Sequence, residues 1–446
     1  MTTNSVTGPP AILDHDLNQY FSELLKFEST PEMEMSEVYR RIKPKVDRIM
    51  NAVVVEHVAR SSPPYKGGVD AAVFHGADGV VLSSPSDFKK VDFQAKNHPT
   101  AKAAPLLRKE GSLLISALAW NLERGTKFDG ILDALQNDPR LKDRDVLMLP
   151  ELDHGMARSG NRFVAKELAE ALDLNYAFAP VYIPLQKGSG VESEMAGENT
   201  VSIHGLAMMS PHPMKNVHAV PLPNGKDKML GKEKRIGWLR ALVADIEHPA
   251  GQFRAVTVHF DVHCSREHRR RQMQIILDQL ETLPKLPTII GGDWNTTTFN
   301  AQSATRAILG YWRRVMMGIK NVAKNHFPHP DRYFEQRLFD ELESRGYAYK
   351  PFNELGVGTL HYHIESIEKN TNLRDWVPEW CFKFIFWAAR RVGGSVSVRL
   401  DWFAGRDIAP AQNTKPQTIA DLVDGSGEPL SDHDAITVDF ITMMGR

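Results

Sequence analysis

The chain has 446 residues, which is long enough for two or three domains. Hydrophobic residues make up 42% of it and charged residues 24%, which is ordinary for a globular protein. The formal net charge of −1 excludes a global field that would draw the chain to nucleic acid or to a membrane. The two cysteines, Cys264 and Cys381, exclude a disulfide framework.

The N-terminal residues contain no basic stretch followed by an apolar one, so the sequence predicts no signal peptide. No apolar run approaches the roughly 18 residues of a transmembrane helix. We therefore expect a cytoplasmic protein.

Residues 1–110 differ from the rest of the chain. Apolar residues at helical spacing within 17–25 and 42–53 predict helices, and a Ser-, Pro- and Gly-rich stretch follows them. We interpret residues 1–110 as a mainly helical N-terminal extension without a catalytic motif.

From residue 111 onward, short apolar runs alternate with turns and a few helices. Predicted strands cover 113–120, 145–150, 201–210, 239–247, 253–260, 287–292, 397–403 and 435–441. Apolar spacing predicts a helix around 128–135, and Ser265 is a candidate cap for a longer one. The pattern favours a layered α+β or sandwich domain over 111–446.

Residues 300–395 interrupt the series of strands and are interpreted as an insertion that acts as a substrate lid. Two stretches in it are both basic and aromatic, GYWRRVMMGIKNVAKNH and WVPEWCFKFIFWAARR.

Eight polar side chains lie at or near the ends of predicted strands, where a sheet presents catalytic groups on a rigid platform. They are Asn121, Glu151, His259, Asp293, Asn295, Asp401, Asp432 and His433. Each residue alone is explained by a turn or a cap. Those separate explanations do not account for the shared placement of all eight.

These residue types suit hydrolysis of a phosphoester, whose negative charge enzymes offset with a hard cation such as Mg²⁺, Mn²⁺ or Ca²⁺. Glu151 is the expected principal ligand, with Asn121 and Asp432 completing the site. Asp293 would orient or deprotonate the attacking water, and Asn295 would donate from its amide.

The histidines would act on the phosphoryl group or on the leaving group. His433 is the expected donor, and Asp401 would fix its tautomer and raise its basicity. His259 would supply a second positive donor.

In this order, the motifs resemble those of the endonuclease/exonuclease/phosphatase (deoxyribonuclease-I-like) superfamily. They are WN (120–121), PE (150–151), GLAMMS (205–210), TVHF (257–260), GGDWNT (291–296), RLDWF (399–403) and SDHDAI (431–436). The resemblance implies a four-layer α/β sandwich of two mixed β-sheets flanked by helices. It also implies a metal-dependent phosphoric ester hydrolase with the residue roles given above.

Three features bear on the substrate. Arg240 matches a position that is often basic in the superfamily, so it is a candidate for phosphate binding, or it only braces the site. Leu206 replaces a family asparagine, which removes a polar contact near the site. VHF and GDWN depart mildly from the usual THL and GDFN.

The insertion leaves two substrate classes open. Its basic and aromatic residues suit nucleic acid, which would make the protein a nuclease. The aromatic stretch 376–391 suits peripheral membrane contact, and thus a lipid-like or small-molecule phosphoester; it equally suits a buried lid helix. A non-catalytic binding module on the same fold is the remote alternative. No obligate protein partner is evident from the sequence.

Overall fold

The computed structural model describes residues 54–56, 114–231, 233–296, 304–363 and 382–443. The predicted helices of the N-terminal extension lie outside these residues. Within 1–110, only β1 (Val54–Glu56) is described, and it is a strand that pairs with β4.

The first sheet has nine strands and contains both parallel and antiparallel pairs. Its main path runs β1-β4-β5-β3-β2-β16-β14, with β7 on β4 and β15 on β16. Besides β1, the strands are β2 (Ile115–Ala119), β3 (Val146–His154), β4 (Asn175–Pro184), β5 (Ile203–Ser210), β7 (Arg235–Gly237), β14 (Ile408–Pro410), β15 (Gln417–Ile419) and β16 (Ala435–Thr442).

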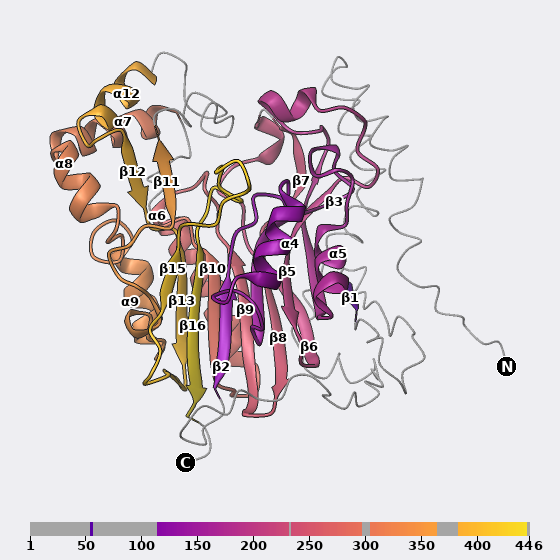
Figure 1. The fold of residues 1–446 in the computed structure, drawn as a ribbon. Helices are drawn as coiled ribbons and strands as arrows, with labels where there is room; N and C mark the ends of the chain where they lie inside the picture. Colours follow the sequence, from indigo (N-terminus) through magenta and orange to yellow (C-terminus); the bar gives the residue numbers. More distant parts are fainter. Residues whose placement is uncertain (1–53, 57–113, 232, 297–303, 364–381, 444–446) are drawn as a thin grey trace, which may run out of the picture.

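The second sheet has five strands in the order β13-β10-β9-β8-β6, and β9 and β10 run parallel. The strands are β6 (Met214–Pro221), β8 (Arg240–His248), β9 (Gly251–His259), β10 (Thr288–Asp293) and β13 (Asp401–Arg406). The two sheets face each other across a common apolar core (Figure 1).

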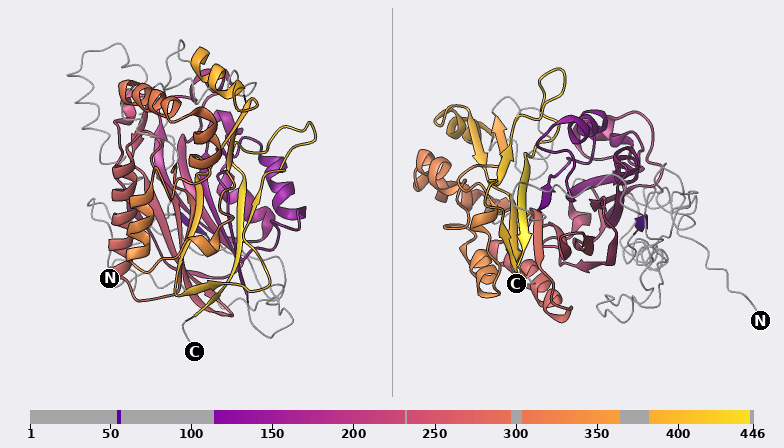
Figure 2. Two further views of the ribbon diagram at one scale, coloured as in Figure 1. Left: turned by 90° about the vertical axis from the view of Figure 1, so that its left-hand side faces the viewer. Right: turned by 60° about the horizontal axis from the view of Figure 1, so that its bottom comes forward.

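Helices cover the outer faces of the two sheets, which gives four layers (Figure 2). On the first sheet, side chains alternate: Ala117 and Ala119 enter the core between the sheets, whereas Leu118 and Trp120 pack under the helices α4 (Phe128–Asn137) and α5 (Val164–Leu172). The helices α6 (Arg266–Thr282) and α9 (Gln336–Ser344) pack on the second sheet. The expected four-layer sandwich is therefore confirmed.

The Ser265 hydroxyl caps α6, because its oxygen accepts from the backbone N–H of His268. This is the helix that the sequence predicted from the same cap. No helix in the described ranges is both long enough and apolar enough to cross a membrane.

The segment predicted as an insertion forms several elements along one side of the sandwich, some of them at its site end (Figure 1). They are α7 (Ala304–Met316), α8 (Ile319–Asn321), the π-helical turn η6 (Val322–His326), α9, the 3-10 turn η7 (Lys350–Phe352), and the strands β11 (Leu360–His363) and β12 (Ser395–Val398) on either side of α12 (Phe382–Arg390). The middle of this segment packs with the sandwich, since Phe339, Leu342 and Tyr349 belong to the main core.

Candidate active site

The eight predicted side chains come from six strands of both sheets and gather at one end of the sandwich. Asn121 follows β2, and Asp432 and His433 precede β16, the antiparallel neighbour of β2. In the other sheet, Asp293 ends β10 beside His259 of β9 and is paired with Asp401 of β13. Most of the eight lie at or next to strand ends, as the sequence predicted, but Glu151 lies inside β3, which continues past the predicted end at 150 to His154.

Asp293 lies at the centre of the group. Its Oδ2 accepts from the side-chain amides of Asn121 and Asn295, both over 3.3 Å, and its Oδ1 accepts from the backbone N–H of Asn295 over 2.8 Å. The Nε2 atoms of His259 and His433 lie 3.6 and 3.8 Å from the same Oδ2. Burial raises the pKa of Asp293; His433 opposes the increase, and Asp401 adds to it.

His433 forms a buried pair with Asp401, whose Oδ2 lies 2.8 Å from Nδ1 of the ring. Burial acts against a charged ring, but the Asp401 and Asp293 carboxylates raise the pKa of His433 well above its ordinary value. The two carboxylates thus favour the charged form of the ring, whose Nε2 lies on the side of Asp293. The indole of Trp120 donates to the backbone oxygen of His433 over 2.9 Å and fixes its backbone.

The insertion contributes a third member to this pair, which sequence reasoning missed. The hydroxyl of the fully buried Thr359 donates to Oδ2 of Asp401. The same oxygen of Thr359 accepts from the backbone N–H groups of Leu400 and Asp401. The only signal in the sequence was a threonine just before the HYH stretch, which is too common a pattern to interpret.

Three carboxyl groups gather on the other side of the site. Glu151 lies where β3 bulges between Leu149 and Leu152, with φ of 56°. Although burial opposes its ionisation, His259 and Arg124 lower the pKa of Glu151 to about 2. The other two carboxyl groups are those of Asp432 and Glu123. Glu123 was not predicted as a site residue, although it lies only two residues after Asn121 in the sequence.

Glu123 and Asp432 interact closely, because Oε2 of Glu123 accepts from the backbone N–H of Asp432 over 3.1 Å. Burial and the Asp432 carboxylate raise the pKa of Glu123 to about 8, and burial and Glu151 raise that of Asp432. Buried carboxylates that repel one another are stabilised by a cation, and oxygen donors of this kind fit Mg²⁺ or Mn²⁺. The donor set is thus consistent with the expected divalent ion.

A buried ion-pair network supports β3 beyond the bulge. Arg158 donates to both oxygens of Asp153 over 2.7 and 3.0 Å and to Glu233 over 3.0 Å. Nδ1 of His204 lies 2.9 Å from Asp153. Because Asp153 lies two residues after Glu151, this network fixes the strand that carries the proposed ligand.

Arg240 begins β8 at the end of the second sheet where β9 finishes with His259. Its side chain is buried, and the guanidinium donates to the backbone oxygen of Pro180 over 3.2 Å. Burial lowers the pKa of Arg240 to about 9. This contact is with backbone of β4, so substrate binding by Arg240 stays a prediction.

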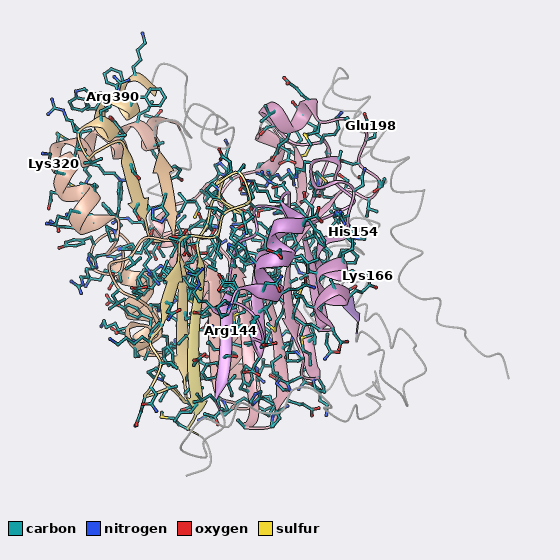
Figure 3. The ribbon with its side chains drawn as sticks, viewed as in Figure 1. Arg144, His154, Lys166, Glu198, Lys320 and Arg390 are labelled. Carbon is teal, nitrogen blue, oxygen red and sulfur yellow. The ribbon has the colours of Figure 1, made fainter. Side chains whose placement is uncertain are left out.

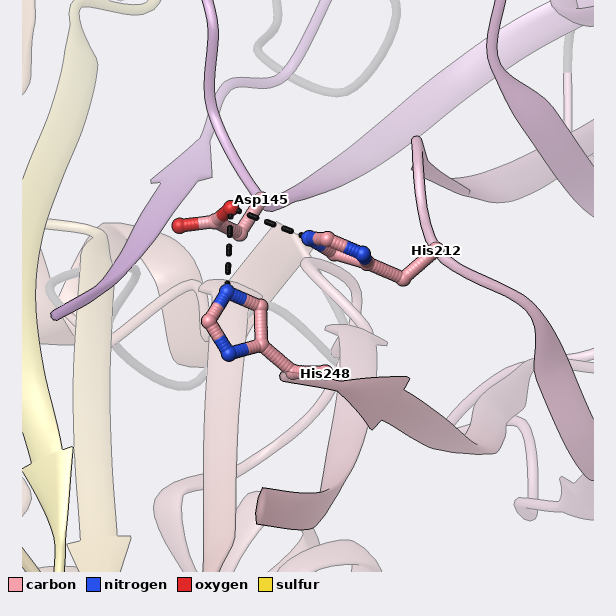
Figure 4. Close-up of side chains that lie close together, drawn as sticks. All are labelled: Asp145, His212 and His248. Carbon is pink, nitrogen blue, oxygen red and sulfur yellow. Dashed lines mark hydrogen bonds and ion pairs between the residues drawn. The ribbon is translucent and has the colours of Figure 1, made fainter. Parts of the chain in front are cut away.

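A second cluster of His and Asp side chains lies away from the site, where Asp145 precedes the start of β3. Nε2 of His212 and Nε2 of His248 each lie 3.2 Å from Oδ1 of Asp145 (Figure 4). The donor atoms of the three lie within 4.8 Å of one another, as in a metal ligand set. However, Nδ1 of His248 accepts from the backbone N–H of Ala250, so the proton of the neutral ring lies on Nε2 and donates to Asp145. We interpret the cluster as a hydrogen-bonded link between the two sheets.

The comparisons with known proteins agree with the motifs. The model of the Endonuclease/Exonuclease/phosphatase family matches residues 118–433. No curated protein sequence matches the chain.

Similar solved structures include an endonuclease/exonuclease/phosphatase from Beutenbergia cavernae, with 15% identity, 74% of this chain and 72% of that chain covered, and a TM-score of 0.44. A 3′-5′ exonuclease from Neisseria meningitidis has 13% identity, with 73% and 100% covered and a TM-score of 0.41. The human Nocturnin catalytic domain with bound sulfate has 15% identity, with 74% and 93% covered and a TM-score of 0.39.

Proposed function

This chain belongs to the endonuclease/exonuclease/phosphatase family, and we propose on that premise that it is a divalent-metal-dependent phosphoester hydrolase. Members of the family are generally hydrolytic enzymes, among them phosphodiesterases, nucleases and phosphatases. The observation that carries the proposal is the convergence of two amides and two histidines on the buried Asp293.

Glu151, Asp432 and Asn121 would hold the cation, and Glu123 lies close enough to Asp432 to support it. When bound, a divalent ion offsets the negative charge of the phosphoryl oxygens as a Lewis acid. The bulge at Glu151 and the network around Asp153 keep the ligand in place before the ion arrives, which avoids reorganisation on binding.

Asp293 would orient the attacking water and accept its proton. The amides of Asn121 and Asn295 hold its Oδ2 in one position, and Asn295 is itself fixed by donating to the backbone oxygen of Phe260 over 2.8 Å. Burial raises the pKa of Asp293, which makes its carboxylate a stronger base than an exposed one. The Asn295 amide would also donate to a phosphoryl oxygen.

His433 would donate from Nε2 to the phosphoryl oxygens or to the leaving group. Its partner Asp401 fixes the ring through Nδ1, so the second nitrogen faces the site. His259, 3.5 Å from Oε1 of Glu151 and 3.6 Å from Oδ2 of Asp293, would be a second donor between the two halves of the site.

For the substrate we propose a phosphodiester or phosphomonoester on a lipid-like or small molecule, with DNA or RNA as the second candidate. Large aliphatic side chains at the surface of the insertion, Leu309 and Met316, favour the first. A panel of sphingomyelin, inositol phosphates, single-stranded DNA and RNA would decide between them.

The test of the activity is hydrolysis of bis-p-nitrophenyl phosphate and p-nitrophenyl phosphate with Mg²⁺ or Mn²⁺. We expect activity to disappear with EDTA and to return when the ion is added back. Asp293→Asn and Glu151→Gln should each lower kcat by roughly 10²–10⁴-fold. Asp129→Asn is the matched control, because that carboxylate is 92% exposed on α4. Unchanged turnover in both site variants would refute the proposal.

A further inference from the structure

We propose that the exposed surface of α7 and α12 is a docking site for an anionic phospholipid membrane. We call it the α7–α12 face and define it by its large exposed apolar side chains, Leu309, Trp312, Met316, Phe384 and Trp387. Binding of the membrane by this face does not require that the protein hydrolyses a phosphoester. Only the substrate that the membrane-bound protein would act on depends on the proposed function.

The apolar side chains of this face are unusually open to solvent. Met316 is 81% exposed, Leu309 is 64% exposed, and Trp312 and Trp387 are 40% and 41% exposed. Exposed aliphatic and aromatic side chains grouped in this way leave apolar area in water that a bilayer interface would cover.

The two helices form one surface although about seventy residues separate them in the sequence. The hydroxyl of Tyr311 donates to the backbone oxygen of Phe384 over 2.6 Å. The rings of Trp312 and Phe384 meet edge to face with centroids 5.5 Å apart. The aromatic side chains are thus held together on a shared platform rather than scattered singly.

Exposed basic residues lie on and next to the same two helices, and acidic residues are absent from these stretches of sequence. Exposed basic residues on or beside the face are Arg306, Arg313, Lys320, Lys324, Lys383, Arg390 and Arg391. Neither 304–326 nor 382–399 contains an aspartate or a glutamate. In a chain with a formal net charge of −1, this segregation makes one local positive surface.

The combination fits a lipid headgroup layer in particular. Arg391 lies over the ring of Trp387, 4.6 Å from its centroid, and an amphipathic tryptophan beside a cation is suited to the boundary between headgroups and acyl chains. Nucleic acid would use the cations and the aromatic rings but would leave Leu309 and Met316 in water, because aliphatic side chains offer no face on which a base can stack. A membrane is therefore the partner that covers both the cations and the aliphatic side chains of the face.

The face is also tied to the active site. α12 leads into β12, which pairs with β11, and Leu360 of β11 forms a bridge with His433. In Figure 1, α7 and α12 lie at the end of the sandwich where β16 begins, and Figure 3 places Lys320 and Arg390 at the outer side of this region. A membrane bound to the face would therefore lie near the end of the sheets that carries the proposed ligands.

The test measures binding of the full chain to vesicles by flotation, without turnover. The vesicles contain phosphatidylcholine alone or phosphatidylcholine with phosphatidylserine. We expect binding to the anionic vesicles that weakens with added salt, together with quenching of tryptophan fluorescence by brominated acyl chains. The triple variant Leu309→Ser/Trp312→Ser/Trp387→Ser should bind at least tenfold more weakly and lose the quenching.

A control pair changes exposed apolar residues elsewhere, Val423→Ser and Met443→Ser, which are 50% and 55% exposed. This variant should bind vesicles like the wild type. The triple variant should keep the wild-type circular dichroism and rate on bis-p-nitrophenyl phosphate, because none of its positions belongs to the site. An inactive wild type that still binds vesicles would refute the proposed function and leave docking intact.

Three results would overturn docking. The first is a wild type that floats with neither kind of vesicle. The second is equal binding by the triple variant and the wild type. The third is binding to single-stranded DNA that the triple variant loses while no chain binds vesicles, which would assign the face to nucleic acid.

Discussion

The hydroxyl of Thr359 donates to Oδ2 of Asp401 over 2.6 Å, and that oxygen also lies 2.8 Å from Nδ1 of His433. A residue of the insertion thus completes a buried Thr–Asp–His series whose other members come from the two sheets. The insertion and the proposed proton donor, His433, are connected through one carboxylate.

Removing the hydroxyl group of Thr359 should therefore reduce turnover. Hydrogen bonds to charged groups contribute roughly 1.5–3 kcal/mol, so Thr359→Val should lower kcat by about 10–100-fold if the bond matters equally in the transition state. Thr359→Ser keeps the donor and should retain most of the activity. Steady-state kinetics of both variants checks this, and equal losses in the two would mean that packing rather than the hydroxyl is responsible.

The pH profile should report on His433. Its pKa is raised mainly by Asp401, so the imidazolium persists at neutral pH and is lost only as the pH rises through that raised value. Asp401→Asn removes this charge, and the decline of kcat/KM on the alkaline side should begin at a lower pH. An alkaline limb at the same pH in both proteins would exclude His433 as the ionising group.

Metal affinity should depend on Glu123. The carboxyl group accepts from the backbone N–H of Asp432, and a bound cation would offset the burial and repulsion that raise its pKa to about 8 and so favour its carboxylate form. Glu123→Gln removes this carboxylate and should weaken Mn²⁺ binding by about 10-fold, the lower end for groups that support a metal ligand. Isothermal titration with Mn²⁺ measures this directly, with Asp129→Asn again as the exposed control. If Glu123→Gln binds Mn²⁺ as tightly as the wild type, Glu123 does not support the ion, and the proposed ligands remain Glu151, Asp432 and Asn121.

Stability should depend on pH through Asp145. Burial works against its charged form, but hydrogen bonds from His212 and His248 hold its pKa well below the ordinary value. A lowered folded-state pKa gives stability that is present above the unfolded value, about 3.9, and is lost as the pH falls toward the folded value. Asp145→Asn should cost about 2 kcal/mol at neutral pH.

The stability difference between wild type and Asp145→Asn should therefore shrink between pH 5 and pH 3, a window of about two units around the unfolded pKa. Urea unfolding of both proteins at each pH measures it. A difference that stays constant across this range would show that the charge of Asp145 does not contribute.

The sequence singled out the eight candidate residues because most of them lie at or next to strand ends, and an apolar run followed by a polar residue is a local pattern. Asn121 after β2 and Asp293 at the end of β10 are examples. Thr359 could not be found in this way, since its role depends on a contact with Asp401 across 42 residues. The sequence cannot show which loops of the insertion return to the site.

The strand boundaries also depend partly on long-range contacts that a local sequence pattern does not reveal. The run 397–403 was predicted as one strand, but the structure divides it between β12 and β13, so that Asp401 starts a strand instead of lying inside one. β4 and β6 were not predicted. Both take their places from their neighbours in the sheets, β5 and β8, and that pairing is a tertiary property.

The position of β16 between β2 and β14 has a consequence for biosynthesis. β2 is among the first strands of the domain to leave the ribosome, yet its neighbour β16 is the last strand that the structure describes. The bond from Trp120 to His433 spans 313 residues. A nascent chain that has already paired β3 with β5 still lacks His433 and Asp432. The proposed hydrolase should therefore remain inert toward phosphoesters during its synthesis until β16 pairs with β2.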